Sequence, residues 1–309
     1  MTTEVNQHIG LEGIFNFKLT NTKTGEIREY EFKNLILNSG IDHYLSNNLY
    51  FMGGCKLGSS SVEPQVTDTT MTGILGTSTT LQASGNAAPN TTVLPYYISH
   101  YWTYRFIEGV ATGNIAQVAM LCNTTNALFS LALVKDGNGT PITITKLADE
   151  VLDVTYTLRM YAPELDVTGT TTISGVDYTY IVRPSRVGYW GLTYLPTDVY
   201  IAEARTGLLG NQLGEPTGSG SAALTKTFAT YVVGTHTRTV TIFWDLNQGN
   251  LSGGIRSIYM VFGPVSYSTP MFCYQVEYTA VTPVNGLTTI PKDATKRLTL
   301  KYQFTVGRV

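Results

Sequence analysis

The stretch Val151-Leu152-Asp153-Val154-Thr155-Tyr156-Thr157-Leu158-Arg159-Met160 alternates strictly, because every second residue from Leu152 onward is large and apolar. Successive side chains of a β-strand point to opposite faces, so this period of two predicts a strand with one face in a core and the other in water. The chain ends on the same pattern, over residues 298–306. Other β-branched and aromatic segments, bounded by Gly, Pro, Asn and Asp, predict further strands at 14–19, 28–37, 98–107, 115–121, 128–134, 142–145, 178–182, 199–204, 228–233, 238–244, 255–261 and 272–278. We therefore predict an all-β fold of antiparallel sandwiches.

Two parts of the sequence are similar to each other. Residues 113–121 resemble residues 253–261, and the strand at 152–158 resembles that at 298–304. The offsets, 140 and 146, differ by an amount that loop lengths explain. Similarity at a nearly fixed offset is the mark of a repeated unit.

The repeat predicts two tandem, mutually similar antiparallel β-sandwich modules, with module one at 1–162 and module two at 163–309. The strands around His100 and His236 match in the same way, at an offset of 136. We interpret the two histidines as a repeated structural position.

Two places interrupt the strand pattern. Ile41, Tyr44 and Leu45 have helical spacing, which predicts one short helix near 39–47 with Ser39 as its N-cap. Residues 58–93 are rich in Ser, Thr, Gly and Asn, and we expect a long polar surface loop there that moves or binds.

Charged residues are scarce. The 309 residues include 20 Lys and Arg against 22 Asp and Glu, so the net charge is −2, and charged residues make up 14% of the chain. This near balance excludes a protein that binds nucleic acid through an excess of positive charge. No apolar run is long enough to cross a membrane, and the N-terminus lacks the features of a signal peptide, so we expect no membrane insertion. With so little charge, uncharged polar residues or neighbouring chains must cover the surface.

The sequence contains no motif typical of catalysis or metal binding. The histidines have no metal-ligand spacing: His8, His43, His100 and His236. The cysteines are odd in number and lack a C-x-x-C pair, which predicts buried free thiols at Cys55, Cys122 and Cys273. We predict a protein that is not an enzyme and has no catalytic residue, metal or cofactor.

The densest group of aromatic residues lies at 96–106. In a strand, Tyr97, Tyr101 and Arg105 share one face, and the other face already carries several large rings. Because Tyr and Arg are enriched at interfaces, we predict that this face is a contact surface. Trp102 and Trp190 join the candidate residues as stacking platforms for a sugar. The alternative, that both faces are covered within the module, stays open.

The order of several segments in module one resembles the order found in a known class of proteins. The segments are residues 34–42 (Asn-Leu-Ile-Leu-Asn-Ser-Gly-Ile-Asp), 56–69, 109–118 and 128–130 ahead of 141–144, and the closing strand of module two, at 296–308, adds to them. This order resembles tailed-bacteriophage tail proteins of the tail-fibre or baseplate type, most closely over 30–160. Module two lacks the Gly-Ser-x-x-x-Pro-x-x-Thr-Asp stretch of module one.

The resemblance implies a non-enzymatic virion structural protein, made in the host bacterial cytoplasm and assembled in multiple copies on the tail. Its role would be that of a tail fibre, baseplate, adaptor or collar component. Its partners would be other copies of itself and other tail proteins.

Two other functions stay open. The first is a glycan-binding adhesin at a fibre tip, which recognises a host surface glycan. The second is a polysaccharide hydrolase, which needs two carboxylates about 5–10 Å apart. No motif singles out such a pair among Asp42, Glu108, Asp149, Glu150, Asp153, Asp177, Asp198 and Glu203.

Overall fold

The computed structural model describes residues 5–46, 52–122, 127–162, 164–185, 199–223, 225–262 and 272–309. The predicted all-β fold is confirmed, since every regular element of these residues is a strand except the helix α1 (Asn38–Ser46). The strands of the first half are β1 (Val5–Asn21), β2 (Ile27–Lys33), β3 (Leu35–Ile36), β4 (Gly54–Gly58), β5 (Ile74–Ser78), β6 (Leu81–Asn90), β7 (Tyr97–Phe106), β8 (Gly113–Ile115), β9 (Gln117–Leu121), β10 (Leu128–Leu133), β11 (Ile144–Lys146) and β12 (Glu150–Tyr161). Those of the second half are β13 (Val167–Ile173), β14 (Val176–Pro184), β15 (Val199–Arg205), β16 (Gly220–Ala222), β17 (Thr225–Phe228), β18 (Thr237–Trp244), β19 (Ser257–Phe262), β20 (Phe272–Ala280) and β21 (Leu298–Arg308).

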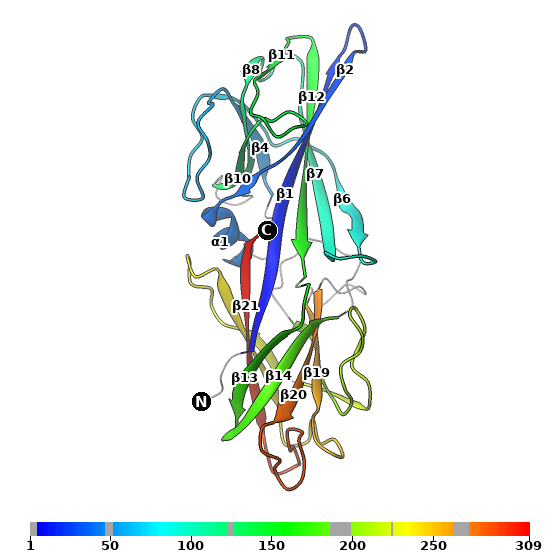
Figure 1. Ribbon diagram of the computed structural model, residues 1–309. Helices are drawn as coiled ribbons and strands as arrows, with labels where there is room; N and C mark the ends of the chain where they lie inside the picture. Colours follow the sequence, from blue (N-terminus) through cyan, green and yellow to red (C-terminus); the bar gives the residue numbers. More distant parts are fainter. Residues whose placement is uncertain are drawn as a thin grey trace.

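The strand order repeats between the halves. The sheet β3-β10-β9-β4-β5 of module one corresponds, strand by strand, to β14-β20-β19-β15-β16 of module two. Each faces part of one large sheet, in which β12-β7-β6 corresponds to β21-β18-β17. The modules lie end to end, and the molecule is elongated (Figure 1).

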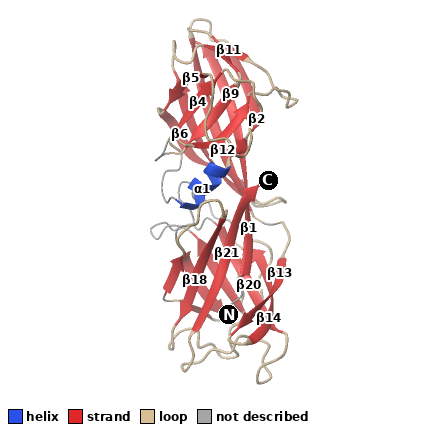
Figure 2. Cartoon of the chain, turned by 90° about the vertical axis from the view of Figure 1, so that its left-hand side faces the viewer, coloured by secondary structure: helices blue, strands red, loops and turns tan. Residues whose placement is uncertain are grey.

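The two modules are not separate sandwiches, because strand β1 belongs to both. Its first part, Val5–Leu11, pairs in parallel with β21, and its second part, from Gly10 to Asn21, pairs antiparallel with β12. The result is one eight-stranded sheet, here called the shared sheet, which runs through the molecule (Figure 2). A strand of 17 residues is about 56 Å long, which is enough to cross both modules. A module boundary at residues 162 and 163 therefore divides the sequence but not the sheet.

The alternating pattern of β12 and β21 is confirmed by their burial. Every second residue from Leu152 to Met160 of β12 and from Leu298 to Val306 of β21 is buried, while the residues that alternate with them are partly or fully exposed. The buried side chains belong to a single hydrophobic cluster that includes residues of both modules. The sequence pattern thus gives the inner face of the shared sheet correctly.

The short helix is confirmed, one residue earlier than expected. Helix α1 spans Asn38–Ser46, so Ser39 lies in its first turn, and its hydroxyl donates to the Leu128 carbonyl at 2.7 Å instead of capping the helix. Gly40 touches β10: a Cβ there would lie 2.1 Å from the Phe129 carbonyl oxygen. Only glycine allows this close approach.

Hydrogen bonds fasten helix α1 and the end of β3 to module two. The Asp42 carboxylate accepts from the Tyr231 hydroxyl and, at 2.7 Å, from the Gly234 amide. Arg238 donates to the Leu45 carbonyl at 2.8 Å, and Arg308 donates to the Ile36 carbonyl. The junction of the modules is therefore fixed by the helix as well as by the shared sheet.

The expected loop at 58–93 is wrong, because this segment contains strands β5 and β6. Strand β6 pairs antiparallel with β7, opposite Tyr101 and Trp102 among others. Small polar residues can form such a ladder because backbone groups make the hydrogen bonds, so an apolar pattern is not needed at the edge of a sheet.

The match between His100 and His236 is also wrong. In β7, His100 lies opposite Leu158, and in β18 Arg238 lies opposite Phe304, the residue that corresponds to Leu158 in the repeat. Arg238 is therefore the structural counterpart of His100. His236 precedes β18 in a turn with φ of 52°. The offset that aligns β7 with β18 is therefore two residues larger than the offset between the two histidines.

Candidate contact surface

The outward residues of β7 and β12 form the candidate contact surface, here called the Tyr97 face. The predicted division of β7 is correct: Tyr97 and Tyr101 are half-buried and Arg105 is exposed, while the alternate residues are buried. The Arg105 guanidinium makes two hydrogen bonds of 2.7 Å to the Asp153 carboxylate on the adjacent strand. A paired guanidinium at the surface keeps further donors for a partner.

Next to this ion pair, the face is neutral. The hydroxyls of Thr103 and Thr155 lie 2.9 Å apart across the two strands. The Tyr101 ring lies over the edge strand β6, where a Cβ on Gly85 would be 3.4 Å from the ring. Tyr101 thus covers part of β6 and leaves part of its own surface exposed.

At the other end of the face, Tyr97 is held by its own chain. Its ring lies 5.3 Å from the Tyr161 ring and 4.7 Å from the Arg159 guanidinium. Both neighbours contact the buried Glu12, which accepts from the Tyr161 hydroxyl at 2.6 Å and lies 2.5 Å from the Lys33 ammonium. Residues of the same chain therefore account for the partial burial of Tyr97, and no partner is needed to explain it.

The charges around Glu12 decide its protonation. Burial alone opposes ionisation, but hydrogen bonds from Lys33 and Tyr161 and the charges of Lys33 and Arg159 outweigh it, so the pKa of Glu12 is lowered. Burial, together with Glu12, raises the pKa of Tyr161 to about 12. Sequence reasoning missed this cluster, because nothing local to Glu12 indicates that β1 pairs with β12.

The prediction that Trp102 is a contact residue is wrong. Its side chain is 5% exposed on the inner face of β7, 4.5 Å from the His100 ring and 6.5 Å from the Tyr156 ring. His100 hydrogen-bonds to Asn86 of β6 at 3.0 Å, and burial lowers its pKa to about 4. Trp190, the other stacking candidate, lies outside the described residues.

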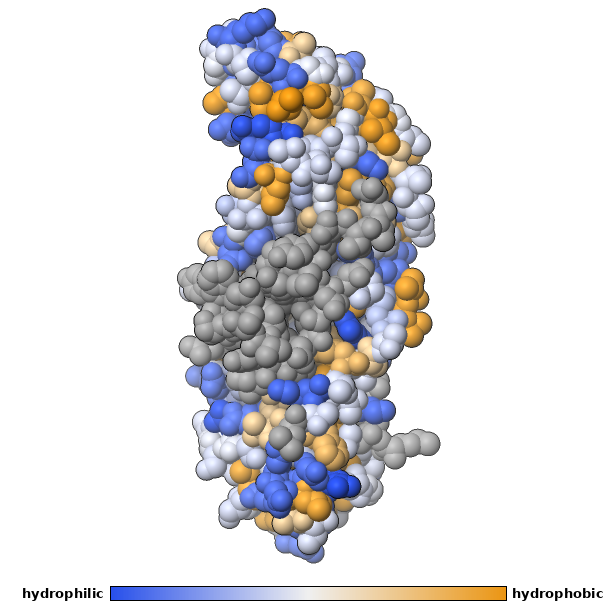
Figure 3. Space-filling model, turned by 180° about the vertical axis from the view of Figure 1, so that it is seen from behind, coloured by the Kyte–Doolittle hydropathy of each residue, from blue (hydrophilic) through white to orange (hydrophobic). Residues whose placement is uncertain are grey.

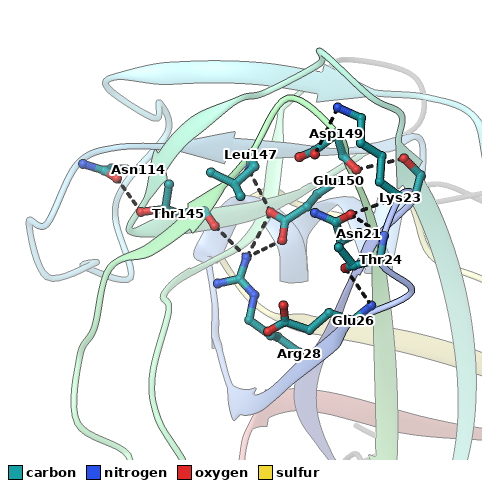
Figure 4. A network of polar contacts seen from close by, with 11 residues as sticks. Asn21, Lys23, Thr24, Glu26, Arg28, Asn114, Thr145, Leu147, Asp149 and Glu150 are labelled. Carbon is teal, nitrogen blue, oxygen red and sulfur yellow. Dashed lines mark hydrogen bonds and ion pairs between the residues drawn. The ribbon is translucent and has the colours of Figure 1, made fainter.

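The carboxylates that are candidates for hydrolysis make hydrogen bonds and ion pairs within the chain. At the end of module one, the buried Glu150 accepts from Arg28 at 2.7 and 2.9 Å and from the Leu147 amide at 2.7 Å (Figure 4). Asp149 lies 3.5 Å from the Lys23 ammonium. Others are hydrogen-bonded or ion-paired in the same manner: Asp42, Glu108, Asp153, Asp177 and Glu203. Asp198 lies outside the described residues.

Two of the expected free thiols are confirmed, because Cys55 and Cys122 are buried and free. The side chain of Cys273 lies outside the described part. Among the residues that the structure describes, no three His, Cys, Asp or Glu side chains form a group able to hold a metal ion. Within the same ranges, no helix has the length and apolar character needed to span a membrane.

Hydrophobic residues on the back of the molecule gather in small separate patches between hydrophilic ones (Figure 3). The Tyr97 face is similar, with half-buried rings between ion pairs. Comparisons of this chain with protein-family models, with curated proteins and with solved structures found no match.

Proposed function

We propose that this chain is a non-enzymatic structural protein of a bacteriophage tail, built into the virion in multiple copies as a fibre, baseplate, adaptor or collar component. The observation that carries the proposal is the shared sheet. Modules joined by a linker usually move relative to each other unless a large apolar interface holds them. Here one strand and one hydrophobic cluster run through both modules.

A rigid, elongated unit of this kind suits a part that keeps a fixed spacing between its neighbours. The hydrogen bonds of Asp42, Arg238 and Arg308 support the same interpretation, because they resist bending at the junction. The neighbours in this proposal are other copies of the chain and other tail proteins.

Mass spectrometry of purified particles of the encoding phage tests the proposal. The chain should be present in a fixed ratio to the major tail proteins. Its absence from washed particles would overturn the proposal.

The Tyr97 face gives a more specific test. Arg105→Glu should reduce incorporation into particles, because it reverses an exposed charge on this face. Lys301→Glu is the matched control, since Lys301 is an exposed outward residue of the same sheet in module two. Equal incorporation of both variants would show that neighbours contact another surface.

A further inference from the structure

At the end of module two that lies away from module one, the structure forms a pocket of about 370 Å³. The β13–β14 turn and the segment before β21 line it, both at the lower end of the molecule in Figure 1. Pockets for small organic ligands begin at about 300 Å³. None of the residues of the Tyr97 face takes part in it.

The wall of the pocket is apolar. Ile173, Tyr178, Ile290 and Leu298 are buried around it, and half-buried Val and Pro side chains complete the wall at Val176, Val284 and Pro291. This lining suits a ligand with a hydrocarbon face. Sugar rings have such a face in their C–H groups.

The charged residues that line the pocket are all cations: Lys292, Lys296 and Arg297. Lys296 and Arg297 are ion-paired with carboxylates that do not line the pocket, with Asp245 2.8 Å from Arg297 and Asp293 3.1 Å from Lys296. The third cation, Lys292, is buried, and its ammonium donates to the oxygens of Asn250 and of backbone carbonyls.

The two outer cations are free to reorient. The side chain of Lys296 is 54% exposed and that of Arg297 is 62% exposed, and ion pairs so exposed hold little energy. An anion at the mouth of the pocket can therefore recruit either side chain without breaking a buried contact. The exposed Ser174 in the β13–β14 turn adds a hydroxyl to the lining.

From the apolar wall and the two exposed cations of the lining, we infer that this pocket binds a carboxylated sugar, with the ring against Val176, Val284 and Pro291 and the carboxylate toward Lys296 and Arg297. This goes beyond the structural role proposed above and does not depend on it. The sugar can be a free monosaccharide or a residue of an acidic polysaccharide, because both present the same ring and carboxylate.

Saturation-transfer NMR with the full chain tests the inference, using D-glucuronic acid and, as its uncharged counterpart, D-glucose. Glucuronic acid should bind with millimolar affinity, and glucose at least about fivefold more weakly, because the charged contact is lost. Added salt should weaken the binding of glucuronic acid, since exposed charges are screened. Equal binding of both sugars, or no transfer from glucuronic acid, would overturn the inference.

Variants locate the site. Val284→Glu should abolish binding, because it places a negative charge in the pocket at a partly exposed position, whereas Val281→Glu, exposed and outside the pocket, should leave binding unchanged. Lys296→Gln combined with Arg297→Gln should weaken binding about fivefold to tenfold, with Lys301→Gln as the control. Thermal unfolding checks that each variant is folded.

Two further arms decide the ligand class. An oligosaccharide of glucuronic acid that binds more tightly than the monosaccharide identifies a polysaccharide as the source, and equal affinity identifies the free sugar. Inorganic phosphate that displaces glucuronic acid at equal concentration would overturn the assignment to a sugar. Mass spectrometry of particles is independent of all these outcomes, so the two proposals can fail separately.

Discussion

Substitution of Ile9 by alanine should destabilise both modules together. Ile9 is 2% exposed and lies opposite Val306 of β21, one residue before Gly10, which pairs with both β21 and β12. Truncating a buried isoleucine to alanine costs about 2–5 kcal/mol. With a urea dependence of about 3 kcal/mol per molar for a chain of this size, a cost of about 3 kcal/mol lowers the unfolding midpoint by about 1 M.

Tryptophan fluorescence can follow each module separately. Trp102 is buried in module one and Trp244 in module two, so variants that keep only one of them, with the other and Trp190 changed to Phe, report on one module each. In both backgrounds Ile9→Ala should lower the midpoint equally, because the shared sheet makes the modules one cooperative unit. The control is Asn6→Ala, an exposed position on the same strand, with an expected change within about 0.5 kcal/mol. A shift in the Trp244 signal with an unchanged Trp102 midpoint would refute the reasoning, because the modules would then unfold independently.

Three further outcomes are expected. His100→Phe should flatten the pH dependence of stability between pH 6.5 and about 4, measured by urea unfolding at several pH values. Burial lowers the pKa of His100 to about 4, so over this range the histidine stays neutral in the folded protein but takes up a proton in the unfolded chain. Up to roughly 3 kcal/mol of stability is therefore lost in the unsubstituted protein as the pH falls through this window. Iodoacetamide should label Cys55 and Cys122 only after unfolding, because burial raises the pKa of both thiols, that of Cys122 to about 12; rapid labelling in native buffer, mapped by mass spectrometry, would contradict this. Trp102→Ala should lower the stability by about 3–5 kcal/mol, seen as a lower unfolding midpoint, and an unchanged midpoint would mean that the ring is not part of the core.

The inner faces of the strands could be predicted from the sequence because burial follows local alternation. Leu152, Tyr156 and Met160 show this in β12. The alternation of β7 also places Trp102 on the buried face, so its choice as a contact residue gave residue type more weight than position. Strand β6 could not be predicted, because its small polar residues have no apolar period and its pairing depends on β7.

The pairing of distant strands was beyond sequence reasoning. The parallel ladder between Val5 and Tyr302 joins residues almost a full chain length apart, and no local feature at either end indicates the other. The same holds for the Tyr97 face, where the contacts of Glu12 with Arg159 depend on the register of β1 against β12. Those contacts follow from tertiary register, which alternation within a single strand does not determine.

The place of β1 in the shared sheet has a consequence for synthesis. The second part of β1 can pair with β12 once residues 150–161 have been made, but the first part pairs with β21, which is synthesised much later. At roughly 5–20 residues per second, the interval between the two is on the order of 7–30 s. During that time Val5 and Ile9 lack their partner and are open to chaperones or to the wrong strand. A message cut short before β21 therefore yields a product in which the first part of β1 lacks its partner strand, although the second part still pairs with β12.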